Sequence, residues 1–204
     1  MASPITLRLP SSYTAGNSPQ TIALPTLDFL IRTWCVTHSS LPMWRSARNV
    51  RITYGALPNS SSPPAPTKVS DLVEYESKSP NLLTSGVNRI RGVDTASGPA
   101  SDTGSWDWRG SGLLFFVTSH WEILGSGERD LNDGSGGKER WVVTWFQKTV
   151  FSAEGVDVYS DRKEGLSEGL KADVLAALRE LEPQLKSLVK EDLTEVEIRL
   201  PWQE

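Results

Sequence analysis

Residues 49–58 read NVRITYGALP, a run in which apolar and polar side chains alternate. In an extended chain, Val50, Ile52 and Tyr54 point to one face and the residues between them point to the other. This period of two is typical of a strand with one buried face. The stretch FLIRTWCVTHS at 29–39 is rich in β-branched and aromatic residues, and we expect it to form the preceding strand.

More strand-like runs follow, separated by loops rich in Gly, Pro and Ser. They lie at 70–77, 88–95, 105–110, 113–125, 140–151 and 156–162. The pattern changes at 165–193, where leucines and valines recur at three- and four-residue spacing and predict an amphipathic helix. Ser167 is a suitable N-cap, and Pro183 predicts a break in this helix. Residues 194–202 can add a short terminal strand.

About eight strands followed by one helix indicate an all-β protein, with antiparallel strands that close into a barrel over about residues 27–162. Closure removes exposed strand edges. A β-sandwich is the competing architecture. We expect residues 1–26, rich in Pro, Ser and Thr, to form an extended arm. Residues 27–204 are expected to form one barrel domain, with the helix at about 165–192 packed outside the barrel.

The chain has 204 residues with 21 basic and 25 acidic side chains, for a net charge of -4. This balance argues against a nucleic-acid-binding surface and gives no reason to expect a membrane partner. Cys35 is the single cysteine, so we expect a buried, free thiol and a reducing compartment. The lack of a secretory-signal run and of a segment long enough to span a bilayer predicts a cytoplasmic location.

Several common chemistries lack their motifs. The glycine-rich segment 125–139 lies between two predicted strands, whereas a phosphate-binding loop needs a helix N-terminus behind it. We do not predict a strand–turn–helix nucleophile elbow. His120 and Glu122 form an H-x-E triplet, but the zinc-deaminase signature also needs P-C-x-x-C. Two histidines and a carboxylate are few ligands for a zinc site, so we expect no metal and no cofactor.

Eight tryptophans are the unusual feature of the composition. They either build a core from large side chains or line a cavity for a small molecule with flat aromatic surface. The second interpretation makes seven aromatic residues candidates for substrate binding. They are Trp34, Trp44, Tyr54, Trp108, Trp121, Trp141 and Trp145.

Two strand faces combine aromatic bulk with polar groups. Trp34 and His38 share one face of the first strand, and His120 and Glu122 share one face of 113–125. These polar groups either satisfy one another in the core or orient a ligand in a cavity. We expect one cavity lined by Trp34 or His38, by Trp121 or His120, and by Trp141 or Trp145, because a one-residue register error swaps the faces. Candidate catalytic hydrogen-bond donors are His38, Arg45, Arg109 and His120.

Four segments resemble a group of fungal calycin-like proteins. They read TWCVTHSSLPMWRSARNVRITY (33–54), SWDWRGSG (105–112), SHWEILGSG (119–127) and WVVTWFQKTVFSAEGVDVYSDRKEGLSE (141–168). The first segment is also similar to the G-x-W opening of lipocalins, although Arg32 stands where the glycine would be. The resemblance implies a lipocalin-like barrel. The group includes pericyclases of secondary metabolism, among them hetero-Diels–Alderases of tropolonic sesquiterpene pathways.

The resemblance therefore implies a cofactor-free pericyclase that acts on a hydrophobic secondary-metabolite intermediate. Such chemistry needs positioning, a donor to a developing charge and a dry cavity. Three alternatives stay open: a lipocalin-like carrier, a haem-binding barrel with His38 or His120 as axial ligand, and an isomerase or dehydratase using His120 with Glu122. The expected partner is a hydrophobic small molecule, and a homodimer is compatible with the sequence.

Overall fold

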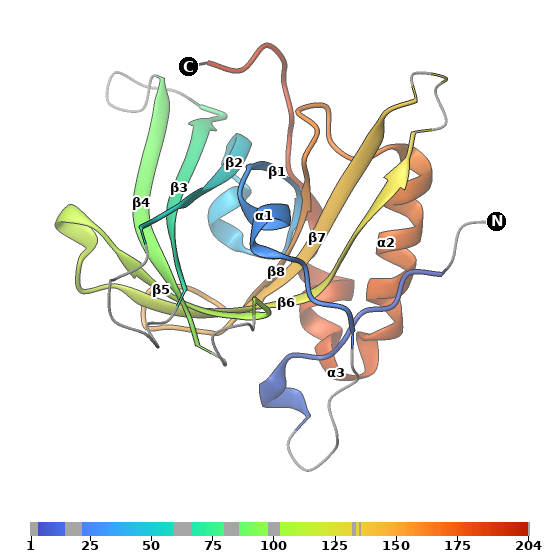
Figure 1. Cartoon of the computed structure of the whole chain (residues 1–204), viewed down its shortest axis with the longest axis horizontal. Coiled ribbons are helices and arrows are strands. Elements are labelled where there is room, and N and C mark those ends of the chain that lie inside the picture. The colour runs from blue at the N-terminus through green and yellow to red at the C-terminus, as the bar shows by residue number, and fades with distance from the viewer. Residues whose placement is uncertain are drawn as a thin grey trace.

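The barrel predicted from the sequence is present in the computed structural model, which describes residues 4–14, 22–58, 67–79, 86–97, 103–131, 134 and 136–203. Within these residues the strands form one antiparallel sheet in which each barrel strand pairs with the next (Figure 1). β1 pairs with both β8 and β2, so the sheet closes on itself and the sandwich alternative is excluded. The strands are β1 (Thr33–Ser39), β2 (Ala47–Ala56), β3 (Lys68–Ser77), β4 (Val87–Ala96), β5 (Ser105–Gly110), β6 (Thr118–Asp130), β7 (Lys138–Phe146) and β8 (Gly155–Ser160).

One end of the barrel is closed by the short helix α1 (Leu27–Leu30). The Thr26 hydroxyl caps this helix by accepting a hydrogen bond from the backbone N–H of Phe29. The buried indole of Trp34 donates from Nε1 to the carbonyl oxygen of Leu30 at 2.9 Å. The aromatic side chain at the start of β1 therefore joins the barrel to its closing helix.

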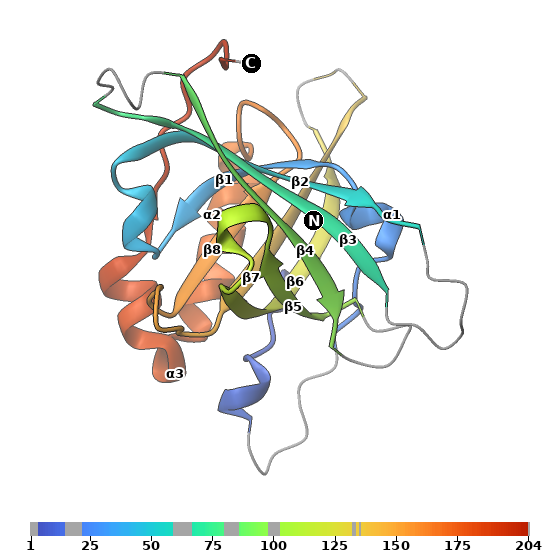
Figure 2. The same ribbon diagram turned by 90° about the vertical axis from the view of Figure 1, so that its left-hand side faces the viewer.

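The opposite end carries the loops that connect β1 to β2, β5 to β6, and β7 to β8, because alternate hairpins of an up-and-down barrel lie at the same end. The first loop contains the 3-10 turn η2 (Pro42–Trp44) and the second contains η3 (Gly112–Leu114). Figure 2 shows the barrel from the side of β3 and β4, with η3 as the yellow-green turn in front.

Outside the barrel, α2 (Glu168–Glu180) is followed by α3 (Glu182–Lys186), the π-helical turn η4 (Ser187–Asp192) and the short strand β9 (Thr194–Glu195). These helices lie along one side of the barrel, beside β7 and β8 (Figure 1). Leu170, Val174 and Leu178 of α2 are fully buried in one cluster with Val156 and Val158 of β8. This outer core is separate from the cluster inside the barrel.

Several sequence predictions for this region are confirmed. Ser167 is the N-cap of α2, where its hydroxyl accepts from the backbone N–H of Leu170. The helix breaks at Leu181, two residues before Pro183. Cys35 is a buried, free thiol. No helix among the described residues is both long and apolar enough to cross a bilayer.

Two strand predictions are too long. The run 113–125 starts as the turn η3, and its strand begins only at Thr118. Gly112 has a φ of 61°, in the left-handed region that glycine adopts readily, so the chain turns there despite the apolar residues that follow. The run 140–151 is extended only to Phe146, where the loop to β8 begins.

Candidate functional site: a cavity inside the barrel

A cavity with a volume of about 160 Å³ lies inside the barrel at the end that carries η2. Its walls are mostly apolar and aromatic, and they include Ile52, Val73, Ile90, Trp121 and Phe146. Polar side chains from several elements also line these walls. Among them are Trp44, Tyr54, Asp71, Trp108, Asp157 and Tyr159.

A stack of aromatic rings forms one wall of the interior. The Trp121 ring lies between Tyr54, whose centroid is 5.7 Å away, and Trp106, whose centroid is 5.9 Å away. Both pairs are stacked, with interplanar angles of 15° and 16°. The indole Nε1 of Trp121 donates to Oδ1 of Asp94 at 2.8 Å. Stacking and this hydrogen bond fix the Trp121 ring in one orientation.

Three aspartates point into the barrel instead of toward water. Asp71 on β3 and Asp94 on β4 are diagonal neighbours, because Asp71 pairs with Gly92 and Val69 pairs with Asp94. Asp157 reaches the interior from β8, and its carboxylate accepts a hydrogen bond from the Ser39 hydroxyl. Strand alternation places these carboxyls in phase with apolar neighbours on the inner face.

Burial keeps these acids partly or wholly protonated near neutral pH. It raises the pKa of Asp71 to about 7. It also raises the pKa of Asp157 to about 7, although the hydrogen bond from Ser39 favours the ionised form. The pKa of Asp94 is raised well above its ordinary value, first by burial and then by the charge of Asp71. A protonated carboxyl can donate a hydrogen bond, which an ionised one cannot.

Several polar atoms in this interior have no hydrogen bond of normal geometry among the described residues, although Trp44 lies near Asp157, and Tyr159 lies near Thr144 and Tyr54. These atoms are Trp44 Nε1, Asp71 Oδ1, Asp94 Oδ2, Thr144 Oγ1 and Tyr159 OH. An unpartnered buried donor or acceptor costs about 1–3 kcal/mol. Trp44, Asp71 and Tyr159 also line the cavity. The arrangement therefore suits a molecule that is mostly apolar and carries one or two polar atoms.

Gly92 makes room for one of the cavity-lining indoles. A Cβ atom built on Gly92 would lie 2.1 Å from Nε1 of Trp108 and 2.4 Å from its Cε2 atom. Gly92 faces Asp71 in the register of β3 and β4. The glycine therefore lets the Trp108 ring cross β4 close to a buried acid.

Of the aromatic residues predicted to line a cavity, the structure brings four together there: Trp44, Tyr54, Trp108 and Trp121. Trp34 belongs to the same interior core but sits toward the closed end. The prediction that Trp141 and Trp145 line the cavity is wrong. Val142 and Thr144 take the inward positions of β7, so both tryptophans face outward and pack in the outer cluster.

None of the four predicted donors reaches the cavity. A bulge between Val36 and His38 shifts the register of β1, and His38 then pairs with Glu195 of β9 on the outside. Arg45 is exposed and pairs with Asp192 at 2.9 Å. Arg109 is exposed on the outer face, where its Nη1 donates to the carbonyl oxygen of Phe115 at 3.1 Å.

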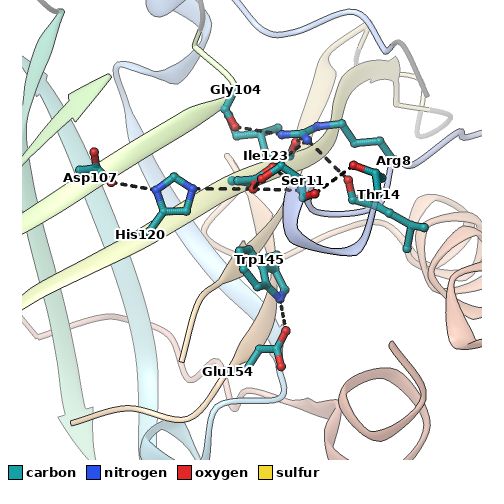
Figure 3. A network of polar contacts seen from close by, with 11 residues as sticks. Arg8, Ser11, Thr14, Gly104, Asp107, His120, Ile123, Trp145 and Glu154 are labelled. Atoms are coloured by element: carbon teal, nitrogen blue, oxygen red, sulfur yellow. Dashed lines mark hydrogen bonds and ion pairs between the residues drawn. The ribbon is translucent and has the colours of Figure 1, made fainter. Parts of the chain in front are cut away.

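His120 belongs to a polar network on the outer face (Figure 3). Its Nδ1 lies 2.8 Å from Oδ1 of Asp107, and its Nε2 lies 3.7 Å from Oε1 of Glu122. Glu122 also pairs with Arg8 at 2.7 Å and accepts from the backbone N–H of Ser11 at 3.1 Å. This network fastens residues 4–14 to the barrel wall. His120 and Glu122 therefore serve an arm contact outside the cavity, which corrects their expected role as an acid–base pair inside it.

His38 and His120 are the two histidines of the chain, and both lie outside the barrel. Neither can reach a group bound in the cavity, so neither can be an axial ligand to a haem held there. Among the described residues, no group of three or more His, Cys, Asp or Glu side chains is arranged to hold a metal ion.

The sequence analysis did not identify the buried acids Asp71, Asp94 and Asp157. The sequence does contain a pattern that identifies Asp71 and Asp157. Asp71 is in phase with Val69 and Val73, and Asp157 is in phase with Tyr159, so each carboxyl falls on the apolar face of its strand. A charged residue on the apolar face of a strand is the pattern that marks such a group.

Comparison with known proteins assigns no family to the chain. No family model matches the chain, and no curated protein matches it. Thirty-seven solved chains match in structure. One of them is the siderocalin Ex-FABP, described as functioning through dual ligand specificities; it has a TM-score of 0.48 and 12% identity, over 84% of this chain and 96% of that one. The strand order itself makes the molecule an eight-stranded, closed, antiparallel barrel of the lipocalin type with a C-terminal helix outside it.

Proposed function

We propose that the barrel binds a small, largely apolar molecule and that Asp71 and Asp157 donate hydrogen bonds to its polar atoms. The observation that carries this proposal is the set of unpartnered polar atoms of Trp44, Asp71 and Tyr159 on an otherwise apolar cavity wall. A ligand oxygen placed between these groups would satisfy them, and the aromatic walls would contact the rest of the molecule.

The size of the cavity limits the ligand. Its volume of about 160 Å³ is smaller than the roughly 300–1,000 Å³ of ordinary ligand sites. It is similar to a cavity of about 150 Å³ that accepts a benzene molecule. One ring or a short branched chain fits inside, and the remainder of a larger molecule would extend through the mouth beside Met43.

We further propose that binding serves catalysis of a cofactor-free pericyclic reaction, such as a hetero-Diels–Alder cycloaddition. The aromatic cavity could hold one π-system in register with a second at its mouth, and positioning can supply up to about 7–11 kcal/mol of a barrier. A protonated carboxyl from Asp71 or Asp157 could stabilise charge on a carbonyl or quinone-methide oxygen. The second candidate, a carrier, uses the same cavity without accelerating a reaction.

Binding is tested by titrating the full chain with small phenols, cyclic enones and quinones in a calorimeter. Replacing Asp71→Leu or Asp157→Leu removes the hydrogen-bond donor and keeps the approximate size of the side chain. We expect binding of the best ligand to weaken at least tenfold, since a hydrogen bond to a buried group is worth about 1–3 kcal/mol. Asp107→Leu, on the outer face beside His120, is the matched control and should bind like wild type. Equal binding by all four proteins would refute the proposed site.

Catalysis is tested with an o-quinone methide generated in solution together with an alkene. We expect the protein to raise the rate and to select one stereoisomer. The acceleration should fall as the pH rises above about 7, because Asp71 and Asp157 then lose their protons. An unchanged product ratio with tight binding would favour the carrier.

A further inference from the structure

The loops around the cavity mouth expose large apolar side chains to water. Leu113 is 92% exposed and Val150 is 95% exposed, and both lie at loop tips. Phe115, Phe116, Phe151 and Met43 are also exposed. We call this set of six residues the apolar rim. Exposed apolar surface that gathers in one place usually marks a site of interaction.

Three residues of the apolar rim pack against one another across two separate loops. The Phe116 ring packs edge-on against Phe115 in its own loop, with centroids 5.7 Å apart. It also packs against Phe151 in the loop between β7 and β8, with centroids 6.1 Å apart. The η3 part of this surface projects toward the viewer in Figure 2. Two loops that are distant in sequence therefore present their apolar tips together.

Basic side chains lie directly behind the apolar rim. A groove of about 910 Å³ on the outer face is lined by Phe116, Phe151, Arg109 and Lys148, and Lys68 lies further along it. The described residues place no ion-pair partner within reach of Arg109 or Lys148. The acidic residue of this groove, Asp107, is hydrogen-bonded to His120. The net charge of -4 for the whole chain hides this local excess of positive charge.

We propose that the apolar rim inserts into the surface of a lipid bilayer that contains anionic lipid, with Arg109 and Lys148 against the headgroups. Apolar tips followed by basic residues match the two layers of such a surface, an acyl boundary beneath negatively charged headgroups. Insertion would place the mouth of the barrel at the hydrocarbon region of the bilayer, where apolar molecules concentrate. This inference goes beyond the proposed function, because rim insertion requires no ligand in the cavity.

The test is sedimentation of the full chain with sucrose-loaded vesicles of phosphatidylcholine, with or without phosphatidylserine. We expect binding to vesicles that contain phosphatidylserine. The double variant Leu113→Ser/Phe115→Ser should bind at least tenfold more weakly, as should Val150→Ser/Phe151→Ser. These side chains are exposed, so the thermal midpoints should stay unchanged. Leu24→Ser, which replaces a partly exposed leucine just before α1 at the closed end, is the control and should bind like wild type.

The two basic residues are tested by how strongly binding depends on phosphatidylserine. Arg109→Gln and Lys148→Gln should each weaken binding to phosphatidylserine vesicles by about fivefold at low salt and leave the weaker binding to pure phosphatidylcholine unchanged. No binding to either vesicle, or binding that the rim variants do not alter, would overturn the proposal. A dimer in light scattering that the rim variants dissociate, without vesicle binding, would also overturn it and assign the rim to a second copy. Ligand titration without vesicles tests the cavity separately.

Discussion

Gly92 and Asp71 pair with each other across β3 and β4. The chemistry of the cavity depends on the small size of Gly92 and on the burial of Asp71. Gly92 lacks a side chain, which leaves space for the Trp108 ring. Asp71 is largely buried, which raises its pKa to about 7. A sequence pattern shows which residues alternate along a strand, but it does not show which neighbours surround them. That is why the aromatic lining at Trp108 and Trp121 was predicted and the acid beside it was not.

Replacing Gly92→Ala should disturb the cavity directly. The new Cβ atom would lie 2.1 Å from Trp108 Nε1, so the indole must move. Overpacking of this kind costs about 1–3 kcal/mol. Urea unfolding should show that loss together with weaker ligand binding. Gly169→Ala is the matched control, since nothing lies within 4 Å of a Cβ there, and its effect should stay within about 1 kcal/mol. Equal effects of the two substitutions would contradict the packing described for Trp108.

Cys35 should react slowly in the native protein. Burial raises the pKa of its thiol to about 12, so the reactive thiolate is scarce at neutral pH. Labelling with a chromogenic disulfide reagent should proceed at least a hundredfold faster in denaturant than in buffer. A fast native reaction would place the thiol at the surface.

Among the elements, β1 shows where prediction from sequence succeeds and where it fails. Its β-branched and aromatic residues identified a strand, and alternation placed Trp34 and Val36 on one face, which is confirmed. A bulge after Val36 then shifts the register, and His38 leaves that face. No residue type in TWCVTHS marks this bulge, because it arises where β1 pairs with β8 and β9. The same limit applies to β7. Its sequence alone does not show whether Val142 or Trp141 faces the interior, because that depends on how β7 pairs with β6 and β8.

The N-terminal arm is a second element that depends on distant residues. Burial alone would raise the pKa of Glu122, but hydrogen bonds from His120 and Ser11 and the charge of Arg8 outweigh it and hold this pKa at about 2. A carboxylate with a lowered pKa stabilises the fold above its unfolded pKa of about 4.3. This contribution is lost as the pH falls toward 2.

Breaking this contact should therefore release the arm. Arg8→Met leaves Glu122 without its cation and should cost about 3 kcal/mol at pH 7, with faster proteolysis near residues 4–14. Arg129→Met removes a pair with Asp173 at 2.7 Å, in which Asp173 is more than half exposed, and should cost less than about 1 kcal/mol. If both variants lose the same stability, the Glu122 network does not anchor the arm.

For the molecule as a whole, the buried acids predict an unusual dependence of stability on pH. Asp71 and Asp157 have pKa values of about 7 in the folded chain, above their ordinary value of 3.8. The folded state then binds more protons than the unfolded state between these values. Their contribution to stability is therefore fully present below about pH 4 and is lost as the pH rises through 7.

Asp157→Asn should remove the part of this loss of stability at rising pH that comes from Asp157. The introduced amide cannot ionise, and its oxygen can still accept a hydrogen bond from Ser39. Relative to wild type, the variant should gain stability between pH 5 and pH 8, by up to about 4 kcal/mol if the full shift applies. Urea unfolding at both pH values measures the difference. A constant offset between the two proteins at every pH would mean that Asp157 titrates normally.

The central claim is that a ligand binds inside the barrel, and one pair of variants tests it most directly. Ser119 lines both the cavity and the outer groove, whereas Thr118, its neighbour on β6, lines the groove and not the cavity. Calorimetric titration of Ser119→Phe with the best ligand of wild type should show binding weakened at least a hundredfold, because the new ring fills the cavity. Thr118→Phe should bind as wild type does. Normal binding by Ser119→Phe, or loss of binding only in Thr118→Phe, would contradict the claim and place the ligand outside the barrel.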